Sequence, residues 1–441
     1  MLHLILPTNI VKKLSSHGLG VLTYVALCSP AFAQTDQSLA LANDASPPAP
    51  AAQTRLIPRI ENEIARIESE QGPFGASLSE QLQSLATRYQ DQGLHEEALI
   101  ALNRAIHVQR INGGLYDLSQ APLIEQTISS HVALGDWNEA SNRHDHLLWL
   151  HQRNFADDDP RMLPVFEKLS DWHLNAYSVN RSSVIGHLLN AYNLYNNSLA
   201  LIQSNFGQND LRLVDPLRGY ALANYYFANL RFEQNDPAYR SQFNQPTSTA
   251  EFSTRDNRRS DREIELKLRI DQYIQSSYVQ GKKAMLKIVD IYKHNDNVDP
   301  KEMFIAQVQL GDWYMLFNAP KAAAKEYEEA LAMVDEKNDE ELSNYAKSVF
   351  SHPTALPDQP LIETESYELN GEPEFVMVKY DVTDNGNTRN IEVLDAQPEN
   401  NIGLRINVKR NLRNAIFRPK YENGKAVDTT GIVHRFVVPN S

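Results

Sequence analysis

Between residues 55 and 350 the sequence repeats a two-helix pattern, and this repetition constrains the fold more than any other feature. Apolar residues recur there at spacings of three and four, which place them on one face of a helix. In the clearest copy a turn glycine separates a helix with large residues from a helix rich in alanine, so the two can pack closely as an antiparallel pair. This copy contains Leu82, Leu85, Ala86, Tyr89, Gly93, Ala98, Leu102 and Ala105.

Two further copies follow the same order of large, small and aromatic residues. The pattern resembles the tetratricopeptide repeat. The resemblance implies a mainly α fold, a tetratricopeptide-type α-solenoid in which each helix pair buries its apolar face against its neighbours and leaves a concave surface for a partner. The second copy contains Ile124, Ile128, His131, Gly135, Trp137 and Ala140, and the last contains Leu310, Gly311, Tyr314, Ala323, Tyr327 and Ala330.

Between these copies the sequence predicts two degenerate helix pairs, which brings the total to about five. The first joins residues 163–176 to 184–202, and the second joins residues 211–232 to 264–292. Residues 233–262 interrupt the second pair with a polar stretch rich in Asn, Gln, Ser and Arg. We expect this insertion to form a surface loop, because little in it could be buried.

In tetratricopeptide-repeat proteins the first helix of each repeat lines the groove. The resemblance therefore implies that nine residues contact a protein partner. The alternative is that they are ordinary solvated helix positions. The nine are Gln83, Thr87 and Gln90 in the first clear repeat, Glu125, Ser129 and Val132 in the second, and Val308, Asp312 and Met315 in the last.

Residues 1–33 have the pattern of a secretory signal peptide. They contain no acidic residue, carry Lys12 and Lys13, and then run largely apolar for about 14 residues. Small residues before Gln34 predict cleavage after Ala33 and export to the periplasm, with residues 34–54 as a flexible linker. Because the apolar run is shorter than the roughly 20 residues that span a bilayer, a cleaved leader is favoured. A leader retained as a membrane anchor is the alternative.

Charge and cysteine content exclude several classes of function. The formal net charge of -14 argues against a protein that neutralises nucleic-acid phosphates. The single cysteine, Cys28, lies in the leader, so no intramolecular disulfide, cysteine nucleophile or thiolate metal site can form. It follows Leu27, where a lipoprotein signal would have a small residue, so lipidation is not favoured.

After Phe350 the pattern changes from helices to strands. Three X-Pro pairs punctuate residues 351–372, which predicts a linker and a domain boundary. Residues 375–382 and 388–394 are predicted strands joined by an Asp-Asn-Gly-Asn turn. An amphipathic helix over 404–415 and a third strand over 431–438 complete a small α+β (β-β-α-β) unit.

This unit, residues 373–441, resembles the C-terminal domain of TonB-type energy transducers. The likeness is carried by Val382-Thr383-Asp384-Asn385-Gly386, Asn390-Ile391-Glu392-Val393-Leu394, Ile416-Phe417-Arg418-Pro419 and Asn423-Gly424-Lys425-Ala426-Val427. One departure is that residues 361–371 lack the Tyr-Pro-containing opening helix usual in the family. The likeness covers under a fifth of the chain.

The TonB-like resemblance implies recognition by strand addition, in which an extended partner segment pairs with an exposed sheet edge. The final strand is the candidate edge, with Ile432, His434, Phe436 and Val438 as candidate contacts. The alternative is that the edge is capped by the helical body or a second copy.

The predicted C-terminal helix is a basic region on an acidic chain. Residues 373–441 carry ten basic and eight acidic side chains, whereas residues 34–372 carry 30 and 48. Arg405, Lys409, Arg410 and Arg413 are therefore candidates for contact with an acidic partner. Docking on the chain's own body, or a plain solvated face, is the alternative.

Motifs for metal binding and catalysis are weak. His144, His146 and His151 are better explained by helix packing than as ligands. The run 157–160 predicts a helix N-cap, and residues 112–116 a helix C-cap and turn. Gly281 lacks the flanking residues of a phosphate loop. The sequence predicts no cofactor, no metal and no enzymatic activity; a hydrolase using His144 or His151 is the remote alternative.

Together these features predict a periplasmic, non-enzymatic adaptor for protein–protein interaction within a TonB-type envelope transport system. The helical repeats would hold one protein partner and the C-terminal unit another, with no nucleic acid and with membrane contact only if the leader is uncleaved. A membrane-anchored TonB-like energy transducer is the main alternative.

Overall fold

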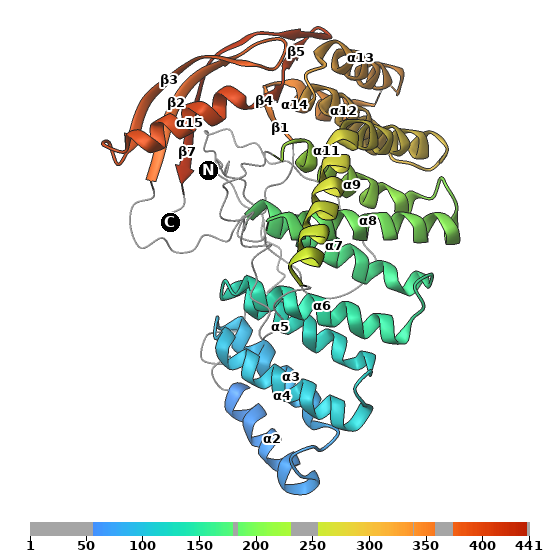
Figure 1. Ribbon diagram of the computed structural model, residues 1–441. Coiled ribbons are helices and arrows are strands. Elements are labelled where there is room, and N and C mark those ends of the chain that lie inside the picture. Colours follow the sequence, from blue (N-terminus) through green and yellow to red (C-terminus); the bar gives the residue numbers. More distant parts are fainter. Residues whose placement is uncertain (1–55, 180–183, 231–254, 338, 358–373, 439–441) are drawn as a thin grey trace, which may run out of the picture. The chain divides into compact units, whose positions relative to one another are not determined.

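The computed structural model describes residues 56–179, 184–230, 255–337, 339–357 and 374–438 (Figure 1). The expected signal peptide and the linker over 34–54 lie outside these residues. The described chain divides into two compact units, and the division along the chain falls between Leu150 and His151. We call residues 56–350 the helical body and residues 374–438 the tail; the second compact unit contains the later part of the body together with the tail.

Paired helices make up the described part of the body, as the periodicity predicts. The predicted core residues Leu82, Ala86, Ala98 and Ala105 are all buried. In the unit that ends at Leu150, the helices are α2 (Leu56–Gln71), α3 (Leu78–Asp91), α4 (His95–Gly113), α5 (Ala121–Ala133) and most of α6 (Trp137–Asn154).

The second unit continues with helices of more varied length. The boundary predicted at Phe350 is where its last body helix ends. These helices are α7 (Leu163–Val179), α8 (Val184–Phe206), α9 (Val214–Ala228), α11 (Arg255–Lys293), α12 (Pro300–Leu316), α13 (Pro320–Lys337) and α14 (Glu340–Phe350).

Glycine has two different roles in these helices. Gly93 and Gly135 lie in turns at positive φ, where other residues are strained. Gly281 in α11 and Gly311 in α12 instead allow close packing, because an added Cβ would lie 2.1 Å from the Trp313 ring and 2.4 Å from the Tyr327 ring, respectively. The similar Leu-Gly pairs at 134–135 and 310–311 therefore serve different purposes.

The predicted loop over residues 233–262 is partly wrong. Helix α11 begins at Arg255, so residues 255–262 are helical, while residues 231–254 lie outside the described chain. Residues 255–262 are rich in Arg and Asp but contain neither Pro nor Gly, so their backbone can continue a helix.

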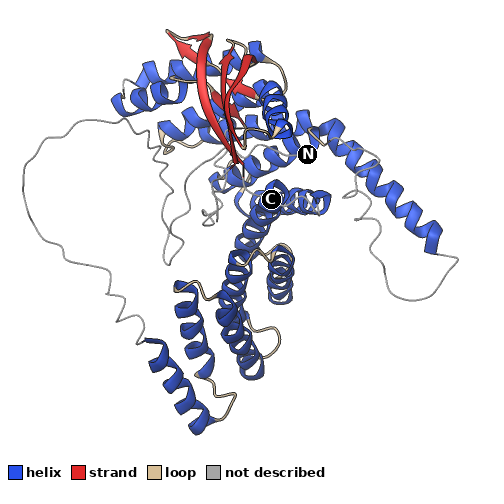
Figure 2. Ribbon diagram, turned by 90° about the vertical axis from the view of Figure 1, so that its left-hand side faces the viewer, coloured by secondary structure: helices blue, strands red, loops and turns tan. Residues whose placement is uncertain are grey.

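The tail is a three-stranded antiparallel sheet in the order β3-β2-β7, with one helix against it (Figure 2). This agrees with the predicted strand-strand-helix-strand order. Four short strands were not predicted. The elements are β1 (Thr354–Leu356), β2 (Glu374–Val382), β3 (Thr388–Gln397), α15 (Ile402–Asn414), β4 (Ile416–Arg418), β5 (Lys420–Glu422), β6 (Lys425–Val427) and β7 (Thr429–Val438).

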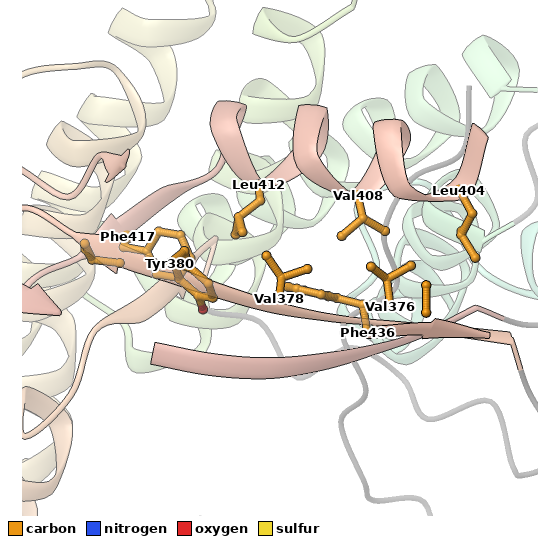
Figure 3. Packing of buried hydrophobic residues seen from close by; sticks show 10 residues of the cluster. Val376, Val378, Tyr380, Leu404, Val408, Leu412, Phe417 and Phe436 are labelled. Carbon is orange, nitrogen blue, oxygen red and sulfur yellow. The ribbon is translucent and has the colours of Figure 1, made fainter. Parts of the chain in front are cut away.

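The core of the tail lies between α15 and one face of the sheet (Figure 3). Leu404, Val408 and Leu412 project from α15 toward Val376 and Val378 of β2. Their spacing of four along the helix and two along the strand is the periodicity of each element, so each contributes one apolar face.

The first residues of the predicted linker belong to the folded structure. Thr354–Leu356 form β1, which pairs antiparallel with β4, and Ala355 lies opposite Phe417. Periodicity could not show this pairing, because three residues between prolines carry too little pattern to identify a strand.

Candidate functional site

In the last clear repeat, the three predicted groove residues are buried. Val308, Asp312 and Met315 on α12 are 3, 6 and 3 % exposed. The carboxylate of Asp312 accepts two hydrogen bonds from Arg418 of β4, with Nε–Oδ1 at 2.9 Å and Nη2–Oδ2 at 2.6 Å. Asp312 therefore contacts the chain's own tail, and none of the three positions is open to a partner in this conformation.

The Asp312–Arg418 ion pair is enclosed on all sides. The side chains are 8 and 4 % exposed, respectively. Tyr327 of α13 donates from its hydroxyl to Asp312 Oδ1 at 2.7 Å, so the buried carboxylate has three donors. Burial, followed by the Asp312 charge, raises the pKa of Tyr327 well above its usual value, and the hydroxyl remains a donor.

Neighbouring residues reinforce the contact between tail and body. Tyr421 of β5 packs edge-on against Tyr327 and also contacts Phe350. Gly386, in the turn between β2 and β3, lies so close to Met315 that an added Cβ would be 2.5 Å from the methionine methyl. Within the second compact unit, the tail is thus fixed to α12, α13 and α14 by charge, aromatic and backbone contacts.

In the earlier repeats, the predicted groove residues are more accessible. Gln83, Thr87 and Gln90 on α3 and Glu125 and Val132 on α5 are half-buried, and Ser129 is exposed. This accessibility is compatible with partner contact and does not test it.

Two of these residues connect consecutive repeats. Gln90 Nε2 donates to Ser130 Oγ at 2.8 Å and to the Gln126 carbonyl at 3.0 Å. Gln126 Nε2 in turn donates to Thr87 Oγ1 at 3.2 Å. Part of the polar face on α3 is therefore used to hold α5 in register.

Strand β7 is an edge of the sheet within the described residues, as predicted. Its pairing with β2 runs without interruption from Ile432 to Val438. The opposite edge, β3, is interrupted by two register shifts against β2, and Asn390 there has a positive φ of 53°. Irregular edges resist pairing with another strand, so β7 is the more suitable of the two for strand addition.

The four predicted edge residues lie in different environments. Ile432 and His434 are half-buried, and Phe436 is buried in the tail core. Burial lowers the pKa of His434. The side chain of Val438 is not described. On the other face of the strand Val433 is exposed, a residue that alternation along β7 could have identified.

The basic residues predicted on the C-terminal helix lie on α15 as expected. Arg405 and Lys409 are half-buried and Arg413 is exposed. None of the three forms an ion pair with the described residues. They are therefore available to an external anion.

The residues considered for metal binding have structural contacts. His144 is buried in α6, and His146 lies 3.1 Å from the Arg110 guanidinium. Burial, followed by the Arg110 charge, lowers the pKa of His146. Over the described chain, no three His, Cys, Asp or Glu side chains are grouped to hold a metal ion. Among the same residues, no helix combines the length and apolar character that crossing a bilayer requires.

The same capping turn precedes two of the helices, α7 and α9, and its recurrence was not predicted from the sequence. Asp159 caps the turn before α7 as predicted, and Asp210 does the same before α9. In both places the arginine two residues later bonds to the capping carboxylate and stacks on a phenylalanine, Phe155 or Phe206. The shared Phe-x₃-Asp-x-Arg spacing was the signal that could have revealed it.

No family model matches the chain, and no curated protein matches it. Among solved structures, TPR-like repeats of a kinesin light chain from Podosopora anserina are 13% identical, with a TM-score of 0.38 over 58% of this chain and 95% of that chain. BtubC (BKLC) from P. vanneervenii is also 13% identical, with a TM-score of 0.38 over 65% and 92%. At TM-scores below 0.5, these likenesses do not establish a shared fold.

Proposed function

We propose that the protein is a non-enzymatic adaptor for protein–protein interaction in the bacterial cell envelope. One partner pairs with the tail by strand addition at β7, and another contacts the exposed positions of the earlier repeats. The observation that carries the proposal is that β7 is, among the described residues, a regularly paired edge of the sheet, whereas the opposite edge, β3, is irregular. Backbone hydrogen bonds along such an edge supply affinity, and alternate side chains supply specificity.

This proposal is best tested in the intact chain and not in a chain that lacks the tail. Deleting residues 373–441 would uncover the buried carboxylate of Asp312, so loss of binding could reflect damage to the body. A photo-crosslinking residue at Val433, which is 53 % exposed on β7, probes the edge in the intact chain. The matched control places the same residue at Glu392 on the exposed face of β3.

The expected result is a discrete crosslinked partner from Val433 and none from Glu392. Proline substitution then tests whether backbone pairing is responsible. With the crosslinking residue kept at Val433, His434→Pro and Arg435→Pro are compared. Because successive N–H groups of a strand point to opposite sides, one of these substitutions removes an outward donor and the other breaks the ladder to β2. The variant that keeps the wild-type Tm should lose the crosslink; equal crosslinks from both edges, or retention in that variant, would refute strand addition.

Location in the periplasm and a role in TonB-type transport are part of the proposal and rest on the sequence patterns of residues 1–33 and 373–441. The alternative is a membrane-anchored energy transducer, which would use the same tail but retain its leader. Cell fractionation with N-terminal sequencing separates the two. A periplasmic chain beginning at Gln34 supports the adaptor, and an intact leader in the inner membrane supports the transducer.

A further inference from the structure

The outward face of α15 carries exposed isoleucines. Leu404, Val408 and Leu412 point into the tail core (Figure 3). On the outer face, Ile402 and Ile406 are 69 and 50 % exposed and lie one helical turn apart. Isolated exposed apolar side chains are common, but two that are neighbours on one helix face can be buried together by the same contact.

Cations continue the same surface. Arg410 and Arg413 extend the line of the two isoleucines at spacings of four and three, and both are exposed. Arg405 and Lys409 flank that line. The helix contains no acidic residue, and none of its four cations forms an ion pair with the described residues.

The shape of this surface distinguishes between possible occupants. Peptide segments are usually recognised in grooves or at sheet edges, which supply contacts from more than one side. The outer side of a helix that covers a sheet is convex and meets a flat surface better than a narrow chain. Apolar residues set among Lys and Arg on such a face are typical of helices that lie in the interface of an anionic bilayer.

We propose that the outer face of α15 binds the surface of an anionic phospholipid bilayer. The isoleucines enter the boundary between headgroups and acyl chains, and the four cations contact lipid phosphates. This contact is independent of strand addition and does not require a retained leader. It would hold the β7 edge near a membrane surface even in a chain cleaved after Ala33.

The test is co-sedimentation of the full chain with vesicles of phosphatidylcholine and phosphatidylglycerol in equal parts, against vesicles of phosphatidylcholine alone. The test variants are Arg410→Gln/Arg413→Gln and Ile402→Ser/Ile406→Ser. The matched controls are Arg88→Gln/Arg269→Gln, two exposed arginines, and Ile100→Ser, which replaces an isoleucine 72 % exposed on α4. Since all variants share residues 1–33, any contribution of the leader cancels.

The expected result is binding that favours anionic vesicles and weakens with salt. Each cation near such a surface contributes about five-fold to partitioning, so the double arginine variant should bind roughly 30-fold more weakly than wild type. The double isoleucine variant should also lose most binding, and the controls should match wild type.

Equal losses in test and control variants would overturn the proposal, as would wild-type protein that ignores anionic lipid. Two further measurements test the other possible occupants of this face: sedimentation of the protein without vesicles, which detects self-association, and binding of an acidic peptide. If the same α15 substitutions abolish self-association, or if the face binds a polyglutamate peptide and not vesicles, then a second copy or an acidic protein is the occupant. All the substituted side chains are exposed, so an unchanged Tm would confirm that folding is intact.

Discussion

The first and last clear repeats use equivalent helix positions in different ways. On α3, Gln83, Thr87 and Gln90 stay half-exposed, and two of them bond to the next repeat. On α12, Asp312 is buried and paired with an arginine from the tail. The same helix face can thus remain open or be filled by another part of the chain, and the tail fills it at the C-terminal end of the body.

The largest effect is expected from removing the cation that fills the last repeat. Arg418→Met leaves the buried carboxylate of Asp312 without its main donor, which should lower the free energy of unfolding of this unit by about 3–5 kcal/mol. Urea denaturation followed by tryptophan fluorescence measures this loss, because Trp313 directly follows Asp312 on α12 and is buried in the same unit. Arg88→Met, at an exposed ion pair on α3, should cost under about 1 kcal/mol; equal costs would contradict the comparison.

A smaller loss of stability is expected from a substitution at Gly386, in the β2–β3 turn that lies close to α12. Gly386→Ala adds a Cβ 2.1 Å from the Phe417 carbonyl oxygen and 2.5 Å from Met315, at a φ of +74°. Strain and overpacking together should cost about 2–4 kcal/mol. Gly424→Ala is the matched control, because its φ is also +74° but no atom lies within 4 Å of the new Cβ.

Gly424→Ala should therefore show the conformational strain alone, about 1–2 kcal/mol. The difference between the two alanine variants, measured by the same urea denaturation, isolates the close contacts at Gly386, with the Phe417 carbonyl of the tail and with Met315 of the body. If both variants lose the same stability, the turn is not packed against Phe417 and Met315 in solution.

In the first clear repeat, where α3 remains accessible, the hydrogen bonds of Gln90 should contribute modestly to the free energy of unfolding. Gln90→Ala removes the bonds to Ser130 and to the Gln126 carbonyl, with an expected cost of about 1–2 kcal/mol in urea denaturation. Gln83 lies about two helical turns from Gln90 on α3 and makes no such bond to α5. The free energy of unfolding of Gln83→Ala should therefore stay within about 0.5 kcal/mol of the wild-type value. A larger effect at Gln83 would show that the polar face of α3 holds α5 differently.

The smallest effect is a pH dependence within the tail. Asp381 accepts hydrogen bonds from Asn390 Nδ2 at 2.6 Å and from the Gly431 N–H at 2.8 Å, and these bonds lower its carboxyl pKa. Because the carboxyl pKa is lower in the folded state than in the unfolded state, the ionised Asp381 stabilises the tail at pH values above the ordinary carboxyl pKa. This stabilisation is lost as the pH falls through the folded-state pKa. Asp381→Asn should flatten the acid limb of Tm against pH, and an unchanged limb would refute the assignment.

Much of the fold could be predicted because it depends on local pattern. Helical spacing identified the cores of α3 and α4, and a run of β-forming residues identified β2. Asn423 and Gly424, both at positive φ, form the turn between β5 and β6, two strands that were not predicted. Contacts between distant segments were not predictable. Arginine is rarely buried, so nothing in the sequence marks Arg418 as the partner of Asp312, 106 residues away.

The candidate sites also divide into those that local pattern predicted and those that depend on contacts between distant segments. The β7 edge followed from strand order and the TonB-like resemblance, and the basic face of α15 followed from helical spacing. The burial of Val308, Asp312 and Met315 did not follow, because the resemblance to tetratricopeptide repeats assigns those positions without knowledge of the tail. The exposure of Ile402 and Ile406 likewise depends on which side of α15 meets the sheet.

The most direct test of the account is a double-mutant cycle between Asp312 and Arg418, since the central claim is that the tail fills the last repeat through this pair. Asp312→Leu and Arg418→Met are each expected to destabilise the unit strongly, because each leaves one buried charge. The double variant should be far less unstable than the sum of the two, with a coupling of at least about 2 kcal/mol. Effects that add to within about 0.5 kcal/mol would show that the two residues do not meet in solution.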